Sequence, residues 1–173
     1  MCIIIDTNTL GPVFNCENVN HSTFKPVYNW IIEGQGKVVY GGTKYLEEIS
    51  KYRRIFKVLK DINKAISIDN EKVDLMTIEA SKAIAHPDFD DQHLIGLLLV
   101  SKCKLICSDD KRAYPFFTHS LFFKARNRPK IYHTLKGISL LDPKYISEIC
   151  LPCRASTNYQ KKTIKEILPQ SLI

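Results

Sequence analysis

The sequence predicts an α/β fold: a three-layer α/β/α sandwich with a central parallel sheet of four or five strands. Short apolar runs rich in β-branched residues alternate along the chain with longer segments of helical periodicity. The first run, Cys2-Ile3-Ile4-Ile5, is apolar at every position, which is typical of a strand covered on both faces. The segments between successive runs are long enough to hold a helix, as connections between parallel strands must be.

Turn and cap residues set the expected boundaries of these elements. Glycines bracket the second strand, and Gly41-Gly42 form the turn that leaves it. Thr43 is a candidate helix N-cap, and Pro87 stops a later helix. The expected strands cover residues 2–5, 37–40, 66–68, 104–107 and 138–141. The expected helices cover residues 23–33, 43–52, 53–64, 73–84, 91–102 and a short stretch at 161–168.

Length and composition are those of an ordinary globular chain. It has 173 residues, 45% of them hydrophobic and 25% charged, which suits one domain that buries its own core. We expect that domain to cover residues 1–150 and a polar C-terminal appendage to cover 151–173. The longest apolar run falls far short of the roughly 18 residues that span a bilayer. The opening MCIIIDTN lacks the basic start of a secretory signal. We therefore expect a cytoplasmic protein without a membrane partner.

The six cysteines show no regular spacing. Cys2, Cys103 and Cys107 lie in apolar surroundings, where cysteine behaves as a small buried hydrophobe. Cys150 and Cys153 have the spacing of a redox pair or of half a zinc site, but no second pair or nearby histidine pair completes it. A structural role with reduced thiols is therefore the favoured interpretation for both.

The net charge of +7 comes from one segment of the chain. Residues 111–137 contain no acid, whereas the rest of the chain is neutral overall. Such a local basic surface favours an anionic partner. Aromatic residues lie between the cations, a mixture that suits single-stranded nucleic acid, although adjacent rings indicate that some belong to the core. The cations of this basic segment are Lys111, Arg112, Lys124, Arg126, Arg128, Lys130 and Lys136.

Acidic residues collect at four places that a parallel sheet brings to one edge. Asp6 follows the first strand, and Asp109-Asp110 follow the strand at residues 104–107. Glu47-Glu48 lie near the start of the helix that leaves the second strand, and Asp90-Asp91 open the helix that leads into the fourth. The carboxyl ends of parallel strands meet at one edge, where α/β proteins place their functional residues.

Two interpretations of these acids are open. Acids at helix starts are often caps that the helix dipole favours by roughly 0.3–1 kcal/mol, and this is the simpler explanation for any one cluster. Four clusters at one edge favour a cation-binding site, because crowded carboxylates repel one another unless a cation lies among them. An all-oxygen set of ligands suits Mg²⁺ or Mn²⁺ and argues against zinc or copper.

At these residues the chain resembles the PIN domain family, metal-dependent nucleases with a parallel-sheet α/β/α fold. The matching stretches are Ile3–Asn8, Leu46–Ile49, Asp91–Leu98 and Leu105–Lys111, and the resemblance extends from Cys2 to Tyr145. It implies hydrolysis of phosphodiester bonds, usually in RNA, by carboxylates that hold one or two divalent ions to activate a water. The family's four acids fall on Asp6, Glu48, Asp91 and Asp110.

The resemblance makes these four acids both the catalytic and the metal-binding residues. Glu48 would be a metal ligand or the base that orients the water, with Glu47 as its alternative. His93 lies two residues after Asp91, so on a helix it would point away from it, and we expect a packing or surface role. Residues that surround the four acids are expected to support them by hydrogen bonds: Asn8, Ser108, Asp90, Glu47 and Asp109.

The expected function is that of a Mg²⁺- or Mn²⁺-dependent endoribonuclease acting on single-stranded or structured RNA. The alternative is a PIN-like module that has lost cleavage and binds RNA or protein. Further expected partners are an inhibitory protein, as for a toxin restrained by an antitoxin, and a second copy of the chain. We expect the basic segment to lie beside Asp110 and to grip RNA through Lys111, Arg112, Lys124, Arg126, Arg128 and Lys130.

Overall fold

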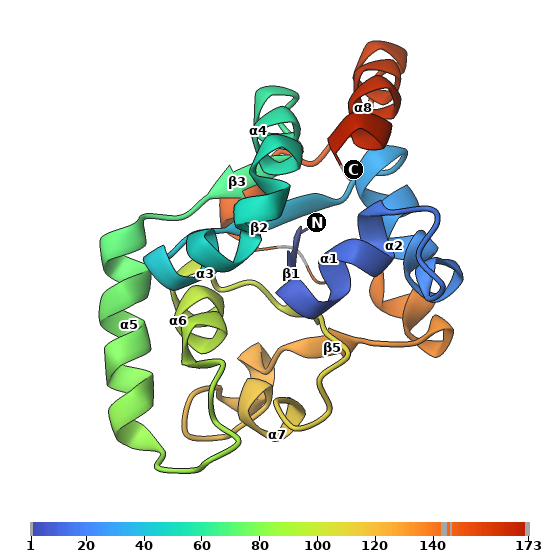
Figure 1. Ribbon diagram of the computed structural model, residues 1–173. Coiled ribbons are helices and arrows are strands. Elements are labelled where there is room, and N and C mark those ends of the chain that lie inside the picture. The colour runs from blue at the N-terminus through green and yellow to red at the C-terminus, as the bar shows by residue number, and fades with distance from the viewer. Residues whose placement is uncertain (1, 143–144, 146, 172–173) are drawn as a thin grey trace.

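The computed structural model describes residues 2–142, 145 and 147–171, and the fold is built on a five-stranded parallel sheet (Figure 1). The strand order is β3-β2-β1-β4-β5. The apolar strand β1 is central, and all four of its residues are buried. The strands are β1 (Cys2–Ile5), β2 (Lys37–Tyr40), β3 (Ala65–Ser67), β4 (Leu105–Cys107) and β5 (Lys130–Tyr132).

Helices connect each strand to the next, so every neighbouring pair of strands is parallel. The helices before β4 are α1 (Thr7–Phe14), α2 (His21–Ile32), α3 (Thr43–Glu48), η1 (Ile49–Tyr52), α4 (Arg53–Asp61), α5 (Asn70–Ala83) and α6 (Gln92–Ser101). Those after β4 are α7 (Tyr114–Phe117), η2 (Ala125–Asn127), η3 (Leu135–Leu140), η5 (Glu148–Cys150) and α8 (Asn158–Ser171).

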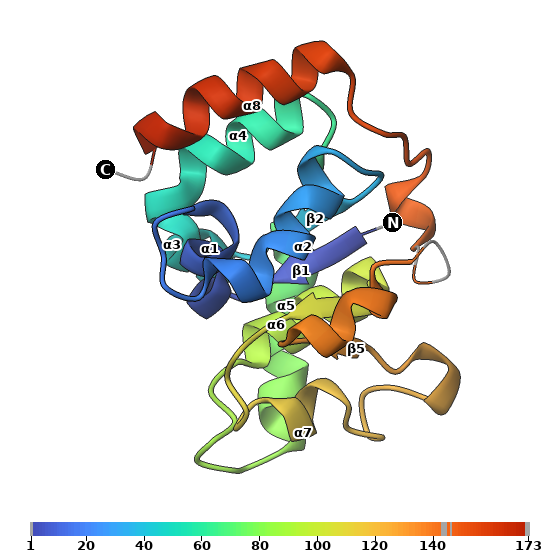
Figure 2. The same cartoon turned by 90° about the vertical axis from the view of Figure 1, so that its right-hand side faces the viewer.

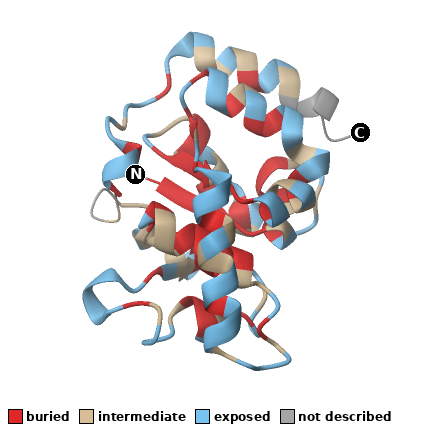
Figure 3. Ribbon diagram, turned by 90° about the vertical axis from the view of Figure 1, so that its left-hand side faces the viewer, coloured by how far each residue is buried: buried red, intermediate tan, exposed pale blue. Residues whose placement is uncertain are grey.

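The helices form a layer on each face of the sheet. In Figure 1, α1 and α2 lie to the right of β1, and α5 and α6 lie to its left; in the view of Figure 2, α1 and α2 lie in front of β1. This division follows from right-handed crossovers, because the chain moves from β1 to β3 in one direction and returns past β1 to β5 in the other. Figure 3 shows the buried residues gathered on the strands and on the helix faces that cover them. The predicted three-layer α/β/α fold is confirmed.

The fifth strand is not where the sequence pattern placed it. Residues 138–141 were expected to form a strand, but Leu135–Leu140 is a 3-10 helix, and the edge strand is Lys130–Tyr132. The prediction was wrong because the apolar residues of this stretch are not sheet residues: Leu135 and Ile138 are about half exposed. The true strand has only three residues and begins with an exposed lysine, so it has no apolar alternation to detect.

Three helices differ from expectation, of which the four-residue α7 was not predicted. The helix α1 directly after β1 was not predicted, because Gly11-Pro12 inside it is a typical turn signal. At the other end, the segment expected as a polar appendage contains α8, which packs on the domain. Ile164 of α8 is buried, and Lys161 forms an ion pair with Glu33 of the α2 C-cap, with 3.0 Å between nitrogen and oxygen.

The buried cysteines behave as expected from their surroundings. Cys2, Cys103 and Cys107 are all buried, and all six cysteines of the chain are free thiols. In the part of the chain that the structure describes, no helix has the length and apolar character needed to cross a bilayer.

Candidate functional site

The parallel topology brings the four acidic clusters to the carboxyl edge of the sheet. Asp6 directly follows β1, and Asp110 lies three residues after β4. Glu48 is the last residue of α3, which leaves β2, and Asp91 is the N-cap residue of α6, which leads into β4. The four predicted acids therefore belong to one region of the molecule, which we call the acidic edge.

Asp6 is the best-anchored member of the acidic edge. Its side chain is buried, and its Oδ2 accepts hydrogen bonds from Ser108 Oγ at 2.6 Å and from Asn8 Nδ2 at 2.7 Å. Burial raises the pKa of Asp6, these hydrogen bonds oppose the rise, and the charge on Glu48 adds to it. Ser108 also accepts a hydrogen bond from the Asp110 backbone N–H at 3.2 Å, so one hydroxyl ties the first acid to the fourth.

Asp91 carries the strongest sign that the carboxylates crowd one another. Burial, followed by the charges on Asp6, Asp90, Glu48 and Asp110, raises its pKa from an ordinary value of 3.8 to about 7. Asp91 occupies the N-cap position of α6, yet its side chain makes no capping hydrogen bond. The cap explanation therefore does not account for Asp91, whose raised pKa reflects burial first and the neighbouring acids second.

Glu48 contacts a buried histidine that was not expected at the site. His93 Nε2 lies 3.2 Å from Glu48 Oε2, although the angle is not that of a hydrogen bond. Thr7 Oγ1 donates to the same oxygen at 3.4 Å, and Lys44 Nζ lies 3.6 Å from Oε1. Burial lowers the pKa of His93, while the nearby Glu48 charge opposes that change. The burial of His93 agrees with the expected packing role, whereas its contact with Glu48 was not expected.

Asp110 is held by its own neighbour in sequence. Arg112 Nη2 lies 2.9 Å from Asp110 Oδ2, and the Arg112 Nε and backbone N–H both donate to Oδ1. This pairing holds the pKa of Asp110 below its usual range. Asp110 is thus ionised in a setting that already supplies one positive charge.

Only some of the residues expected to support the four acids form hydrogen bonds with them. Asn8 bridges two strands, because its Nδ2 donates to Asp6 and its Oδ1 accepts from the Asp109 backbone N–H at 3.2 Å. The side chains of Asp109 and Glu47 are exposed. Asp90 is also exposed, and its charge contributes to the raised pKa of Asp91. Glu48 rather than Glu47 therefore faces the other acids.

The four acids have the right ligand atoms for a hard divalent cation, but their side chains are not arranged around one common point. All four acids offer carboxylate oxygens, and the neighbouring negative charges add to the effect of burial in raising the pKa of Asp91. However, no three of the His, Cys, Asp and Glu side chains in the described residues are placed to share one metal ion. Asp6 is directed to Ser108 and Asn8, and Asp110 to Arg112.

The basic segment spans the sheet from one edge to the other. Lys111 and Arg112 lie at the acidic edge, directly after Asp110. The segment then crosses to the amino edge, where β5 begins at Lys130, as parallel strands require. The two edges are roughly 10–13 Å apart, the length of a three- to four-residue strand. In Figure 2 the loop between α7 and β5 reaches the side of the molecule on which the N-terminus lies.

The expectation that the whole basic segment lies beside Asp110 is therefore wrong for the four cations at or near the amino edge. The cations at or near the amino edge are exposed: Lys124, Arg126, Arg128 and Lys130. Most of the rings between them belong to the core, because Phe116, Phe117, Phe123 and Tyr132 are buried. Base stacking by these four rings is excluded in this arrangement.

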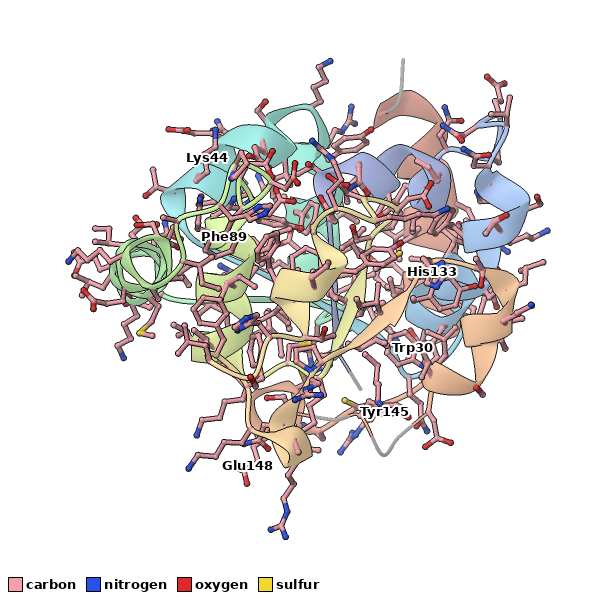
Figure 4. The ribbon with its side chains drawn as sticks, turned by 90° about the horizontal axis from the view of Figure 1, so that it is seen from below. Trp30, Lys44, Phe89, His133, Tyr145 and Glu148 are labelled. Atoms are coloured by element: carbon pink, nitrogen blue, oxygen red, sulfur yellow. The ribbon has the colours of Figure 1, made fainter. Side chains whose placement is uncertain are left out.

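Sequence reasoning also missed Tyr45 of α3. It is fully buried, and its hydroxyl donates to the Ile5 carbonyl at 2.6 Å. Burial raises the pKa of Tyr45, and the charges on Asp6 and Glu48 add to the rise, which places the ring behind the two carboxylates. The available signal was its position three residues before Glu48, which is one helical turn. Figure 4 labels Lys44 and Phe89 near this edge and Glu148 on the opposite side of the molecule.

No family model matches the chain, and no curated protein or solved structure is similar to it at a significant level.

Proposed function

We propose that the protein is a Mg²⁺- or Mn²⁺-dependent endoribonuclease that resembles the PIN domain family. One observation carries the proposal: four acids from separate parts of the chain lie at the carboxyl edge of the sheet, where burial, followed by the charges on the neighbouring acids, raises the pKa of Asp91 to about 7. Such a group is relieved by a divalent cation, for which carboxylate oxygens are the preferred ligands. The four acids lie at the carboxyl edge of the sheet, which is where α/β proteins commonly bind their substrates.

In this proposal Asp6, Glu48, Asp91 and Asp110 hold the cation. The bound cation would supply an activated water and would neutralise charge on the scissile phosphate. Asn8 and Ser108 keep the Asp6 carboxylate fixed by their hydrogen bonds. Thr7 and His93 restrict the Glu48 carboxylate from two sides.

Arg112 has a double part in the proposal. Its guanidinium forms an ion pair with Asp110. A phosphate of the RNA at the acidic edge would be a second partner, because guanidinium groups commonly form two parallel hydrogen bonds to phosphate. Lys111 lies next to Arg112 and is exposed. Single-stranded or structured RNA that continues across the basic segment would meet Lys124, Arg126, Arg128 and Lys130 at the amino edge.

A second candidate is a PIN-like module that binds RNA or protein without cleaving. The ion pair between Asp110 and Arg112 favours it, because an acid that is already neutralised is a weaker metal ligand. An inhibitory partner protein and a cytoplasmic location belong to the nuclease proposal, and the six free thiols are in keeping with a reducing compartment.

One experiment separates the two candidates. The purified protein is incubated with mixed single-stranded RNA and DNA in Mg²⁺, in Mn²⁺ and in EDTA, and the products are resolved on a denaturing gel. The nuclease proposal predicts RNA cleavage with either metal and none in EDTA. Binding on a native gel without cleavage in any condition would select the binding module.

A further inference from the structure

A second cluster of charged residues lies at the amino edge of the sheet, away from the acidic edge. Lys37 begins β2, and Lys64 directly precedes β3. Both are buried, with 4% and 2% of their surface exposed. Together with Arg154 they line a pocket of about 380 Å³ between these strands and the segment that leads into α8. Figure 2 shows that segment running up the same side of the molecule as the N-terminus.

The two lysines are buried without an acid. Lys64 Nζ donates to the carbonyls of Gly34 at 2.7 Å and Arg154 at 3.2 Å, and Lys37 Nζ donates to Asn63 Oδ1 at 3.1 Å. These partners are neutral, and among the described residues no carboxylate lines the pocket. Burying a charge without an opposite charge is costly, so the pocket as it stands is short of negative charge.

The surroundings of the pocket do not supply that charge. Glu33 is already paired with Lys161 and Lys165, at 3.0 Å and 3.5 Å. Burial and the nearby charge of Lys37 lower the pKa of Lys64 to about 8, and Lys161 adds to the effect. The structural interpretation, that Lys64 ties the C-terminal segment to the sheet, explains its carbonyl contacts but not the burial of a second cation beside it.

We propose that this pocket binds a phosphate group, as inorganic phosphate or as the phosphomonoester of a small ligand such as a mononucleotide. Three cations suit a dianion, and ammonium and guanidinium groups are the usual partners of phosphate oxygens. Asn63, Thr157 and Gln160 also line the pocket and add polar side chains to these cations. The pocket volume falls within the range of sites that hold small molecules.

The proposal is independent of the nuclease proposal, since the pocket and the acidic edge are at opposite ends of the strands. It is tested by thermal unfolding and isothermal titration calorimetry in EDTA, with inorganic phosphate, AMP and adenosine as probes and chloride at matched ionic strength as the blank. We expect phosphate and AMP, but not adenosine, to bind and to raise the melting temperature by mass action.

Two variants weaken the site, and three controls leave it intact. Arg154→Gln changes an exposed side chain, and Lys37→Gln removes a buried charge; each is expected to raise the Kd for phosphate at least tenfold. Lys162→Gln on the exposed side of α8, Arg126→Gln in the basic segment and Asp6→Asn at the acidic edge should leave the Kd unchanged.

The Arg154→Gln variant keeps the test decisive if Lys37→Gln does not fold, which far-ultraviolet circular dichroism would show. The proposal is overturned if the unmodified protein binds neither phosphate nor AMP at 10 mM. This concentration is about two hundredfold above a Kd of roughly 50 μM, at which the melting temperature would rise by several degrees. The proposal is also overturned if adenosine alone binds, or if Lys162→Gln or Arg126→Gln weakens binding as much as Arg154→Gln does.

Discussion

Replacing Asp91 by asparagine is expected to stabilise the metal-free protein, and to do so more strongly at pH 8 than at pH 5. Asparagine has the shape of the protonated carboxyl group but cannot ionise. At pH 5 Asp91 is mostly protonated in the folded protein but ionised in the unfolded chain, so part of the difference is already present. Above that pKa, the unmodified protein must hold another negative charge among Asp6, Asp90, Glu48 and Asp110.

The sign and size of this effect follow from the pKa of Asp91. The folded value of about 7 lies above the ordinary 3.8, so the folded protein binds more protons than the unfolded chain between these values. Stability from this group is therefore fully present below about pH 3.8, is lost as the pH rises from there to about 7, and changes little at higher pH. The full difference corresponds to about 4 kcal/mol. Because the Asp91 side chain is only partly buried, solvent screening reduces the expected value to about 1–2 kcal/mol.

The assay is thermal unfolding in EDTA from pH 5 to pH 8. For a chain of this size, about 1–2 kcal/mol corresponds to a rise of about 2–8 °C in the melting temperature of Asp91→Asn over the unmodified protein at pH 8. Asp109→Asn is the matched control, because Asp109 is an exposed acid of the same edge. Mn²⁺ at pH 8 should stabilise the unmodified protein more than Asp91→Asn. Parallel pH curves for the unmodified protein and Asp91→Asn would refute the reasoning.

Three further changes test single contacts. Ser108→Ala removes the 2.6 Å hydrogen bond to Asp6, so the pKa of Asp6 should rise in a carbon-13 NMR titration; an unchanged value would show that the bond is unimportant. Tyr45→Phe removes the buried 2.6 Å hydrogen bond to the Ile5 carbonyl and should cost about 1–2 kcal/mol in urea unfolding, whereas no loss would contradict the contact. Ile164→Ala should cost about 2–4 kcal/mol in the same assay, and a loss below about 0.5 kcal/mol would mean that α8 is not part of the cooperative fold.

The meeting of the four acids could be predicted because it depends only on topology. Once the strands are parallel, the residues that follow them share an edge, whatever the details of packing. Local sequence was sufficient to find β1 and β4, and therefore to place Asp6 and Asp110 together. The same logic applied to the basic segment would have shown that a connection from β4 to a parallel β5 must end at the opposite edge.

What could not be predicted depends on contacts between distant residues or on the exact start of a helix. His93 was expected to point away from Asp91 because both were taken to be helical. Asp91 precedes the helix, with φ −92° and ψ 35°, so helical spacing does not relate the two side chains. The contact of His93 with Glu48 joins residues 45 positions apart, and no local pattern indicates it.

The two edges of the sheet carry charged residues of opposite sign. The carboxyl edge gathers acids, of which Asp110 is paired with Arg112 and Asp91 has a raised pKa, and the amino edge gathers two buried lysines whose pocket is lined by no carboxylate among the described residues. The two proposals assign a ligand of opposite charge to each region. The exposed cations from Lys124 to Lys130 lie near the amino edge on the far side of the sheet from β3, so the pocket and the basic segment are separable by mutation.

The most direct test of the central claim is the single-turnover rate of RNA cleavage at a fixed Mn²⁺ concentration by the unmodified protein, Asp6→Asn and Asp109→Asn. All three should be folded, as judged by circular dichroism. The proposed role of Asp6 predicts that its variant cleaves slower by about 100-fold or more, whereas Asp109→Asn stays close to the unmodified rate. Cleavage by folded Asp6→Asn at the unmodified rate, or no Mn²⁺-dependent cleavage by the unmodified protein, would contradict the claim that the acidic edge is a catalytic metal site.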